Sequence, residues 1–271
     1  MARCLIALGA NQGPRAETLR RAIAEISQLP QTQVLARSAW RQVPPVGGPA
    51  GQEPYLNGAL LAETVLTPSE VLARLHAIES RLGRVRTVHW GPRLIDLDLL
   101  LVDRHVCRTP ELTLPHPHMQ HRGFVLGPAA EIAPHLVDPV SQWTLAALWS
   151  HLQTGANEVA VVASDPAVAD SLAAYLVERL DKCPAADSMP RVVRWAAVEG
   201  VDLASHRPKL ILAVIPATGI GQPEMRRMLQ LPATGPVSWI AAADPETVAQ
   251  RCNPSGLICF RLTTHDPSWS A

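Results

Sequence analysis

Two carboxylates stand two residues apart in the apolar run 94–102, which reads LIDLDLLLV. Side chains alternate between the faces of a strand, so Asp96 and Asp98 are predicted to share one face, roughly 6.6–7 Å apart along the chain. Two like charges buried side by side are costly unless a cation or a shared proton compensates them. A hard divalent cation such as Mg²⁺, completed by phosphates and waters, would compensate them. An edge strand with both carboxylates in water is the alternative.

Four arginines flank this carboxylate pair in the sequence. Arg84, Arg86 and Arg93 precede it in GRVRTVHWGPR, and Arg122 follows it. Guanidinium groups bind phosphate oxygens through paired hydrogen bonds and keep their charge. The loop between a helix and the carboxylate strand is therefore predicted to close over polyphosphate. Simple ion pairs with the carboxylates are the alternative.

Three histidines lie close together in LPHPHMQH, at His116, His118 and His121. Zinc is one interpretation, but the intervening Pro117 and the irregular context disfavour ligation from one helix face. A histidine that donates to a phosphate or a leaving oxygen, with His116 as the candidate, is the better functional interpretation.

A second group of residues fits a flat heterocycle. Tyr55 and Asn57 are two apart on a predicted strand and share a face. A buried Asn must satisfy up to four hydrogen bonds, which the edge of such a ring would provide. Trp90 and Phe124 would stack on the ring, unless they are ordinary core residues.

The elements that must position these residues follow the order β-α-β-β-α-β, which is the ferredoxin-like order. Thr67 to Glu70 form a predicted capping box with proline at the first helical position. A Pro/Gly loop is predicted over 44–54, an irregular segment over 110–127 and short closing helices over 128–152. The predicted strands are 4–8, 34–40, 55–64 and 94–102, and the predicted helices are 15–28 and 68–82.

The second half of the chain has a different organisation. Composition shifts near 153–157, which predicts one domain over 1–155 and another over 156–271. Alternating strands and helices indicate a smaller three-layer α/β domain with a mostly parallel sheet. Its predicted strands are 159–163, 192–198, 210–215, 237–242 and 257–262, and its helices are 166–180, 222–230 and 245–251.

Composition excludes several classes. Lys plus Arg and Asp plus Glu both number 24 in the 271 residues, so no basic excess favours nucleic acid or an acidic membrane. No run approaches the 18 or so apolar residues of a spanning helix. The five cysteines are widely spaced without a CxxC, which favours a reducing compartment and hence the cytoplasm.

Four segments together resemble the 6-hydroxymethyl-7,8-dihydropterin pyrophosphokinases of folate synthesis. They are ALGANQG, the PPVG…PYLNGAL segment, IESRLGRVRTVHWGPRLIDLDLLL and LTLPHPHMQHRGFVLGP. The resemblance implies an α+β ferredoxin-like pyrophosphokinase domain over roughly residues 2–150. It also implies an ATP-dependent diphosphokinase that transfers pyrophosphate to the pterin, releases AMP and uses two Mg²⁺ ions.

The resemblance assigns roles residue by residue. As catalytic residues it implies Arg84, Arg93, Asp96 and Asp98, of which Asp96 and Asp98 hold both metal ions. For ATP it implies Glu79, Arg84, Arg86, Arg93, Thr113, His116 and Arg122. For the pterin it implies Gly9, Asn11, Val43, Pro45, Val46, Tyr55, Asn57, Trp90 and Phe124.

The second domain has no such assignment. A nucleotide kinase needs a GxxxxGK[ST] loop, but Ala163, Ser164, Asp165 and Pro166 stand where that loop would follow the first strand. Three interpretations remain open: a degenerate nucleoside-kinase-like fold, a module for homodimerisation or for binding a folate-enzyme partner, and a second active enzyme. For the whole chain, the alternative to an enzyme is a non-catalytic regulator that binds ATP or pterin.

Overall fold

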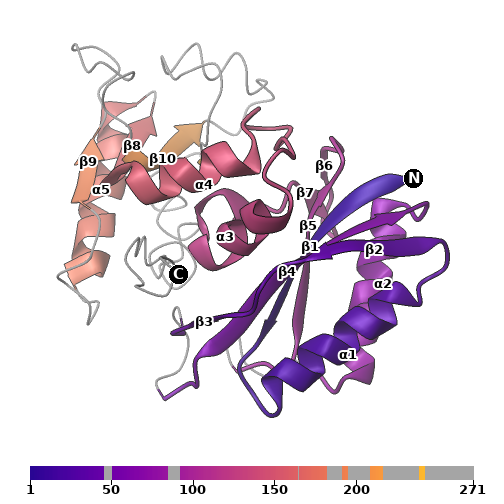
Figure 1. The fold of residues 1–271 in the computed structure, drawn as a ribbon. Coiled ribbons are helices and arrows are strands. Elements are labelled where there is room, and N and C mark those ends of the chain that lie inside the picture. Colours follow the sequence, from indigo (N-terminus) through magenta and orange to yellow (C-terminus); the bar gives the residue numbers. More distant parts are fainter. Residues whose placement is uncertain are drawn as a thin grey trace. The chain divides into compact units, whose positions relative to one another are not determined.

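The computed structural model describes residues 1–45, 51–84, 92–163, 165–181, 191–194, 208–215 and 238–241. The chain divides into two compact units, Met1–Trp149 and Ser150–Ala271 (Figure 1). Each unit is described by itself. No helix in the described part of the chain is both long and apolar enough to cross a membrane.

The first unit is built on an antiparallel sheet, as predicted. Its strands run in the order β2-β4-β1-β5, with β3 also paired to β4. The strands β1–β5 are Ala2–Ala10, Thr32–Arg37, Arg41–Val43, Tyr55–Thr64 and Asp96–Val102. The β-α-β-β-α-β order is therefore present with β3 added.

The predicted strand over 34–40 is confirmed as β2, but β2 ends at Arg37, three residues earlier than predicted. The chain leaves β2 at Arg37 and resumes as β3 at Arg41. Ser38 makes the corner, because its N–H donates to the Ala59 carbonyl at 3.0 Å and its hydroxyl accepts from the Ala59 N–H at 2.9 Å. The Ser38 hydroxyl thus accepts the Ala59 N–H hydrogen bond in place of a backbone carbonyl of a continuing strand.

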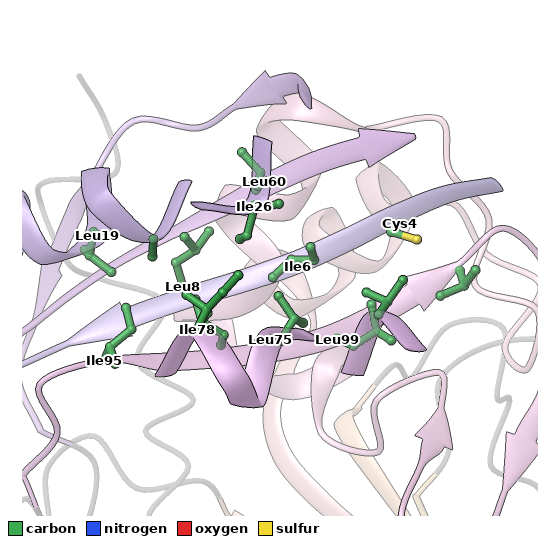
Figure 2. Close-up of a cluster of buried hydrophobic side chains, with 14 of the residues drawn as sticks. Cys4, Ile6, Leu8, Leu19, Ile26, Leu60, Leu75, Ile78, Ile95 and Leu99 are labelled. Atoms are coloured by element: carbon green, nitrogen blue, oxygen red, sulfur yellow. The ribbon is translucent and has the colours of Figure 1, made fainter. Parts of the chain in front are cut away.

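Helices α1 (Arg15–Ser27) and α2 (Pro68–Arg81) cover one face of this sheet (Figure 1). The predicted capping box is confirmed, since the Glu70 N–H donates to the Thr67 hydroxyl and the Thr67 N–H donates to the Glu70 carboxylate. Apolar side chains of the sheet and both helices form the core, including Ile6, Leu8, Leu60, Leu19, Ile26, Leu75 and Ile78 (Figure 2).

Helix α3 (Gly123–Ile132) packs on the opposite face, against β4 and β1 (Figure 1). It begins inside the segment predicted to be irregular, and Pro128 lies within it. The run 125–130 is buried. The packing of these small and apolar residues outweighs the penalty for an internal proline. The shorter elements are β6 (Cys107–Arg108), β7 (Thr113–Leu114), the 3₁₀ turn η1 (Met119–His121) and α4 (Leu145–Thr154).

The described strands of the second unit are all parallel and run in the order β11-β10-β8-β9. Helix α5 (Pro166–Asp181) follows β8. The strands β8–β11 are Ala156–Ala163, Arg191–Arg194, Pro208–Ile215 and Ser238–Ala241. The predicted strand 257–262 and helices 222–230 and 245–251 lie outside the described residues, so the three-layer arrangement stays a prediction. The division between the units falls inside α4.

Candidate active site

One row of residues crosses the sheet on the face opposite α1 and α2. Asn57 of β4 pairs with Gly9 of β1, and Gly9 pairs with Asp96 of β5. Residues paired across a ladder share a face, and Leu97 next to Asp96 packs into the core on the other face. Asp98 lies one row further along, opposite Ala7. The predicted shared face of Asp96 and Asp98 is confirmed.

Gly9 leaves the middle of this row without a side chain. A Cβ there would lie 2.9 Å from the Asn57 Oδ1 and 3.9 Å from the Asp96 Cβ. Because Gly9 has no Cβ, the Asn57 amide oxygen lies close over the backbone of β1, and no side chain of β1 stands between the amide and the Asp96 carboxylate.

The Asn57 amide carries a donor without a partner among the described residues. Its residue is 7% exposed, and among the described residues its Nδ2 has no hydrogen-bond partner. A buried polar atom without a partner is uncommon and calls for an explanation. An acceptor on the edge of a bound ring would supply one.

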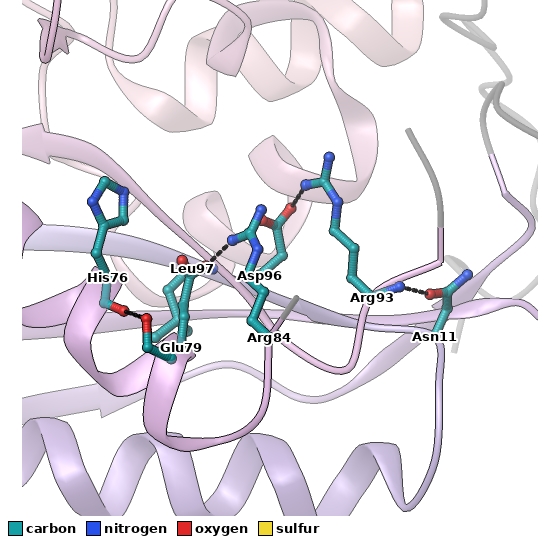
Figure 3. A network of polar contacts seen from close by, with 8 residues as sticks. Asn11, His76, Glu79, Arg84, Arg93, Asp96 and Leu97 are labelled. Atoms are coloured by element: carbon teal, nitrogen blue, oxygen red, sulfur yellow. Dashed lines mark hydrogen bonds and ion pairs between the residues drawn. The ribbon is translucent and has the colours of Figure 1, made fainter. Parts of the chain in front are cut away.

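Asp96 lies between two arginines (Figure 3). Arg84 Nη1 lies 2.7 Å from Asp96 Oδ1, and Arg93 Nη1 donates to Asp96 Oδ2. Arg84 also donates to Glu79, whose Oε1 accepts from the Leu97 N–H at 2.7 Å. An unbroken chain of charge-assisted contacts thus joins the end of α2 to the start of β5.

Burial of the Asp96 carboxyl disfavours its charged form. Burial raises the pKa of Asp96, the charge of Asp98 raises it further, and Arg93 and Arg84 oppose the rise. Within the described part of the chain, no hydrogen bond or close ion pair engages the Asp98 side chain. These two neighbouring carboxylates, one of them open, fit a divalent cation. The described residues contain no group of three or more His, Cys, Asp or Glu arranged for a metal, so other ligands would have to complete the shell.

The histidine-rich segment lies beside β5. The His116 N–H donates to the Leu100 carbonyl at 2.9 Å, and its ring meets the His118 ring edge-on at 5.8 Å. Burial, with the charge of Arg122 added, lowers the pKa of His116 to about 4 and that of His118 to about 3. Both are neutral at pH 7, and a neutral imidazole still offers one N–H to a phosphate oxygen.

Phe124 and Arg122 stand at the start of α3, with the guanidinium 5.9 Å from the ring centroid. Burial lowers the pKa of Arg122, and Asp98 and Asp96 oppose this. Across the sheet, Tyr55 pairs with Val43 of β3. The predicted pterin residues of β1, β4 and α3 therefore come from elements that adjoin one another.

Two predicted residues have internal partners that the sequence did not reveal. Glu79 is 2% exposed, and its carboxylate is engaged by Leu97 and Arg84. The Oδ1 of Asn11 accepts from the Arg93 N–H at 2.6 Å, and its Nδ2 donates to the Glu53 carbonyl at 3.2 Å. Glu79 was predicted from the family resemblance alone, and its hydrogen bonds to Leu97 and Arg84 were not predicted. The predicted residues Val46, Arg86 and Trp90 lie outside the described residues.

The family model described as 7,8-dihydro-6-hydroxymethylpterin-pyrophosphokinase (HPPK) matches residues 5–134. Curated proteins named 2-amino-4-hydroxy-6-hydroxymethyldihydropteridine pyrophosphokinase are similar to the chain. The one from Synechocystis sp. is 43% identical over 141 residues, which are 52% of this chain and 71% of that protein. The one from Pseudomonas aeruginosa is 42% identical over 134 residues, which are 49% of this chain and 82% of that protein. The chain belongs to the HPPK family.

Crystal structures of Plasmodium falciparum HPPK-DHPS are also similar to this HPPK family member. The match to the wild type has a TM-score of 0.44 at 12% identity, and it covers 91% of this chain and 74% of that chain. The wild type with pteroate has a TM-score of 0.45 at 10% identity, and the match covers 84% of this chain and 61% of that chain. These TM-scores assign no fold to the second unit.

Proposed function

We propose that this chain transfers the pyrophosphoryl group of ATP to 6-hydroxymethyl-7,8-dihydropterin, as a step of folate biosynthesis. The hydroxymethyl oxygen loses its proton to solvent and bonds to the β-phosphorus. The bond between that phosphorus and the oxygen that bridges it to the α-phosphorus breaks, and AMP leaves with that oxygen. The row Asn57–Gly9–Asp96 is the observation that carries this proposal. It joins an amide whose Nδ2 has no partner among the described residues to a carboxylate flanked by arginines, with no side chain at Gly9 between them.

The chain's residues divide between the two substrates. Asn57 and Tyr55 would bind the edge of the pterin, with Gly9, Asn11, Val43, Pro45 and Val46 lining it. Trp90 and Phe124 would stack on its faces. Arg84 and Arg93, with Glu79, Arg86, Thr113, His116 and Arg122, would bind ATP. Catalysis then rests on positioning and on charge neutralisation.

Asp96 and Asp98 would hold two Mg²⁺ ions. The open Asp98 carboxylate and the raised pKa of Asp96 support this donor set. When bound, Mg²⁺ would neutralise charge on the phosphate oxygens of ATP. Holding the two carboxylates at a fixed spacing on one strand is the contribution of the protein.

For the second domain, 156–271, we propose an accessory role, either in homodimerisation or in binding a folate-enzyme partner. Its parallel described strands fit either this role or a degenerate nucleotide-binding fold. We place the protein in the cytoplasm, which the sparse, widely spaced cysteines support.

The variant Asp98→Ala tests the proposed function. Purified chain with ATP, Mg²⁺ and the dihydropterin should form AMP, and Asp98→Ala should lower turnover by about 10³-fold or more. Circular dichroism and pterin binding should remain those of the wild type, because Asp98 has no hydrogen bond or close ion pair among the described residues. Normal turnover in this variant would contradict the role given to Asp98.

A further inference from the structure

Glu131 lies near the end of α3 and holds strand β3 with both carboxylate oxygens. Its Oε1 accepts from the backbone N–H of Ala39 at 2.8 Å, and its Oε2 accepts from Arg41 Nη2 at 2.8 Å. The residue lies about two helical turns from Phe124, on the same helix. Neither Glu131 nor Arg41 belongs to the predicted site.

Strand β3 needs such an anchor. It has three residues, and its described ladder partner is β4 alone, through Arg41 with Asn57 and Val43 with Tyr55. A ladder this short contributes few hydrogen bonds, so the position of β3 depends on contacts from outside the sheet. Glu131 supplies two of them, and both are charge-assisted.

Helix α3 therefore links two walls of the proposed pterin pocket. Phe124 stands at its first turn, and Glu131 at its last turn fixes the strand that carries Val43 and leads to Pro45. The spacing between the ring-stacking wall and the β3 wall is then set by one rigid element.

We propose that Glu131, acting together with Arg41, is a positioning residue for the pterin, which holds β3 at the distance from α3 that the ring requires. This inference rests on the proposed function. It assigns Glu131 no contact with substrate and no part in the chemistry of the phosphates.

The exposure of the pair decides what its loss should do. The Arg41 and Glu131 side chains are 23% and 34% exposed. Ion pairs at such partly exposed positions contribute little to global stability. Breaking this one should leave the domain folded and loosen β3 locally, which selectively weakens pterin binding.

The experiment compares Glu131→Ala, Arg41→Ala and the double variant in the full chain. A matched control is Glu25→Ala, because Arg81 donates to Glu25 at 2.6–2.8 Å and that pair joins α2 to α1 on the other face of the sheet. For each protein we would measure KM for pterin and for ATP, kcat, the pterin Kd by calorimetry without ATP, and the melting temperature.

Each variant of the Glu131 pair should raise the pterin KM and Kd about three- to fivefold, with kcat and the ATP KM within about twofold of wild type. The double variant should bind pterin no more weakly than Glu131→Ala, because Glu131→Ala already breaks the contact between Glu131 and Arg41. Glu25→Ala should change none of these constants. A pterin Kd like that of wild type, or equal losses for pterin and ATP, would contradict the positioning role. Absence of pterin-dependent AMP formation in the wild type would instead contradict the proposed function.

Discussion

Both oxygens of the Asp96 carboxylate are engaged by arginines, Arg84 on one and Arg93 on the other. A cation held by Asp96 needs at least one of these oxygens. The same guanidinium groups are proposed to bind the phosphates, so the arrival of nucleotide would draw them away from Asp96. Metal and nucleotide are therefore expected to bind cooperatively.

Removing Arg93 tests this competition at the residue scale. Arg93→Ala should tighten Mn²⁺ binding to the protein without nucleotide by about three- to tenfold, because one competing cation is gone. The same variant should lower turnover. Calorimetric titration with Mn²⁺ measures the affinity, and Arg81→Ala, which changes an arginine paired with Glu25, is the control. Unchanged or weaker Mn²⁺ binding would show that Arg93 does not compete for Asp96.

Gly9 gives a second prediction at the same scale. Gly9→Ala would place a methyl group 2.9 Å from the Asn57 Oδ1, so the amide must move away from the row. The pterin Kd should rise about tenfold, since a displaced Asn57 amide loses its hydrogen bonds to the ring. The ATP Kd should stay within about twofold. Calorimetry for both ligands checks this, and an unchanged pterin Kd would exclude Asn57 from the pterin site.

At the scale of the element, the segment that contains His116, His118 and η1 carries three histidines kept neutral by burial. The pKa of His116 is lowered to about 4, that of His118 to about 3, and that of buried His121 well below its usual value. In the unfolded chain each returns to about 6.5. Between pH 6.5 and about 4 the unfolded chain therefore binds more protons, and the free energy of unfolding falls as the pH falls.

Urea unfolding of the full chain at pH 7, 6 and 5 measures this slope. Each neutral histidine adds at most about 1.4 kcal/mol per pH unit to it. His121→Gln should make the slope shallower, whereas His135→Gln, at an exposed position of the same unit, is the control. Equal slopes in His121→Gln and the wild type would contradict this origin of the pH dependence.

The sequence predicts elements well where the signal is local. The alternation over 94–102 placed Asp96 and Asp98 on one face, and Thr67 marked the start of α2. The split between β2 and β3 was missed because the Ser38 bonds to Ala59 depend on a partner far along the chain. The early start of α3 was missed because the packing of its buried residues outweighs the penalty of its internal proline, Pro128.

The same limit applies to the site. Residue types and spacing indicated Asp96, Asp98, Tyr55 and Asn57, since each pair lies on one strand. The row that joins Asn57 to Asp96 through Gly9 depends on strand register, which no local pattern encodes. Glu131 gave no signal, because its partners Ala39 and Arg41 lie about 90 residues earlier in the chain.

At the scale of the whole molecule, every predicted site residue lies between Gly9 and Phe124, inside the first unit. A fragment over 1–155 keeps α4 intact, whereas a cut at the division between the units would sever it. This fragment should fold and form AMP at a rate within about threefold of the full chain, as expected of a domain with its own core. A folded but inactive fragment would mean that the second unit contributes to the site.

The most direct test of the central claim identifies the products made by the full chain from ATP, Mg²⁺ and 6-hydroxymethyl-7,8-dihydropterin. Phosphorus-31 NMR distinguishes transfer of two phosphates, which leaves AMP, from transfer of one phosphate, which leaves ADP. We expect AMP and a pterin carrying two phosphates in equal amounts, and neither without the pterin. ADP and a pterin monophosphate, or consumption of ATP that ignores the pterin, would contradict pyrophosphoryl transfer at this site.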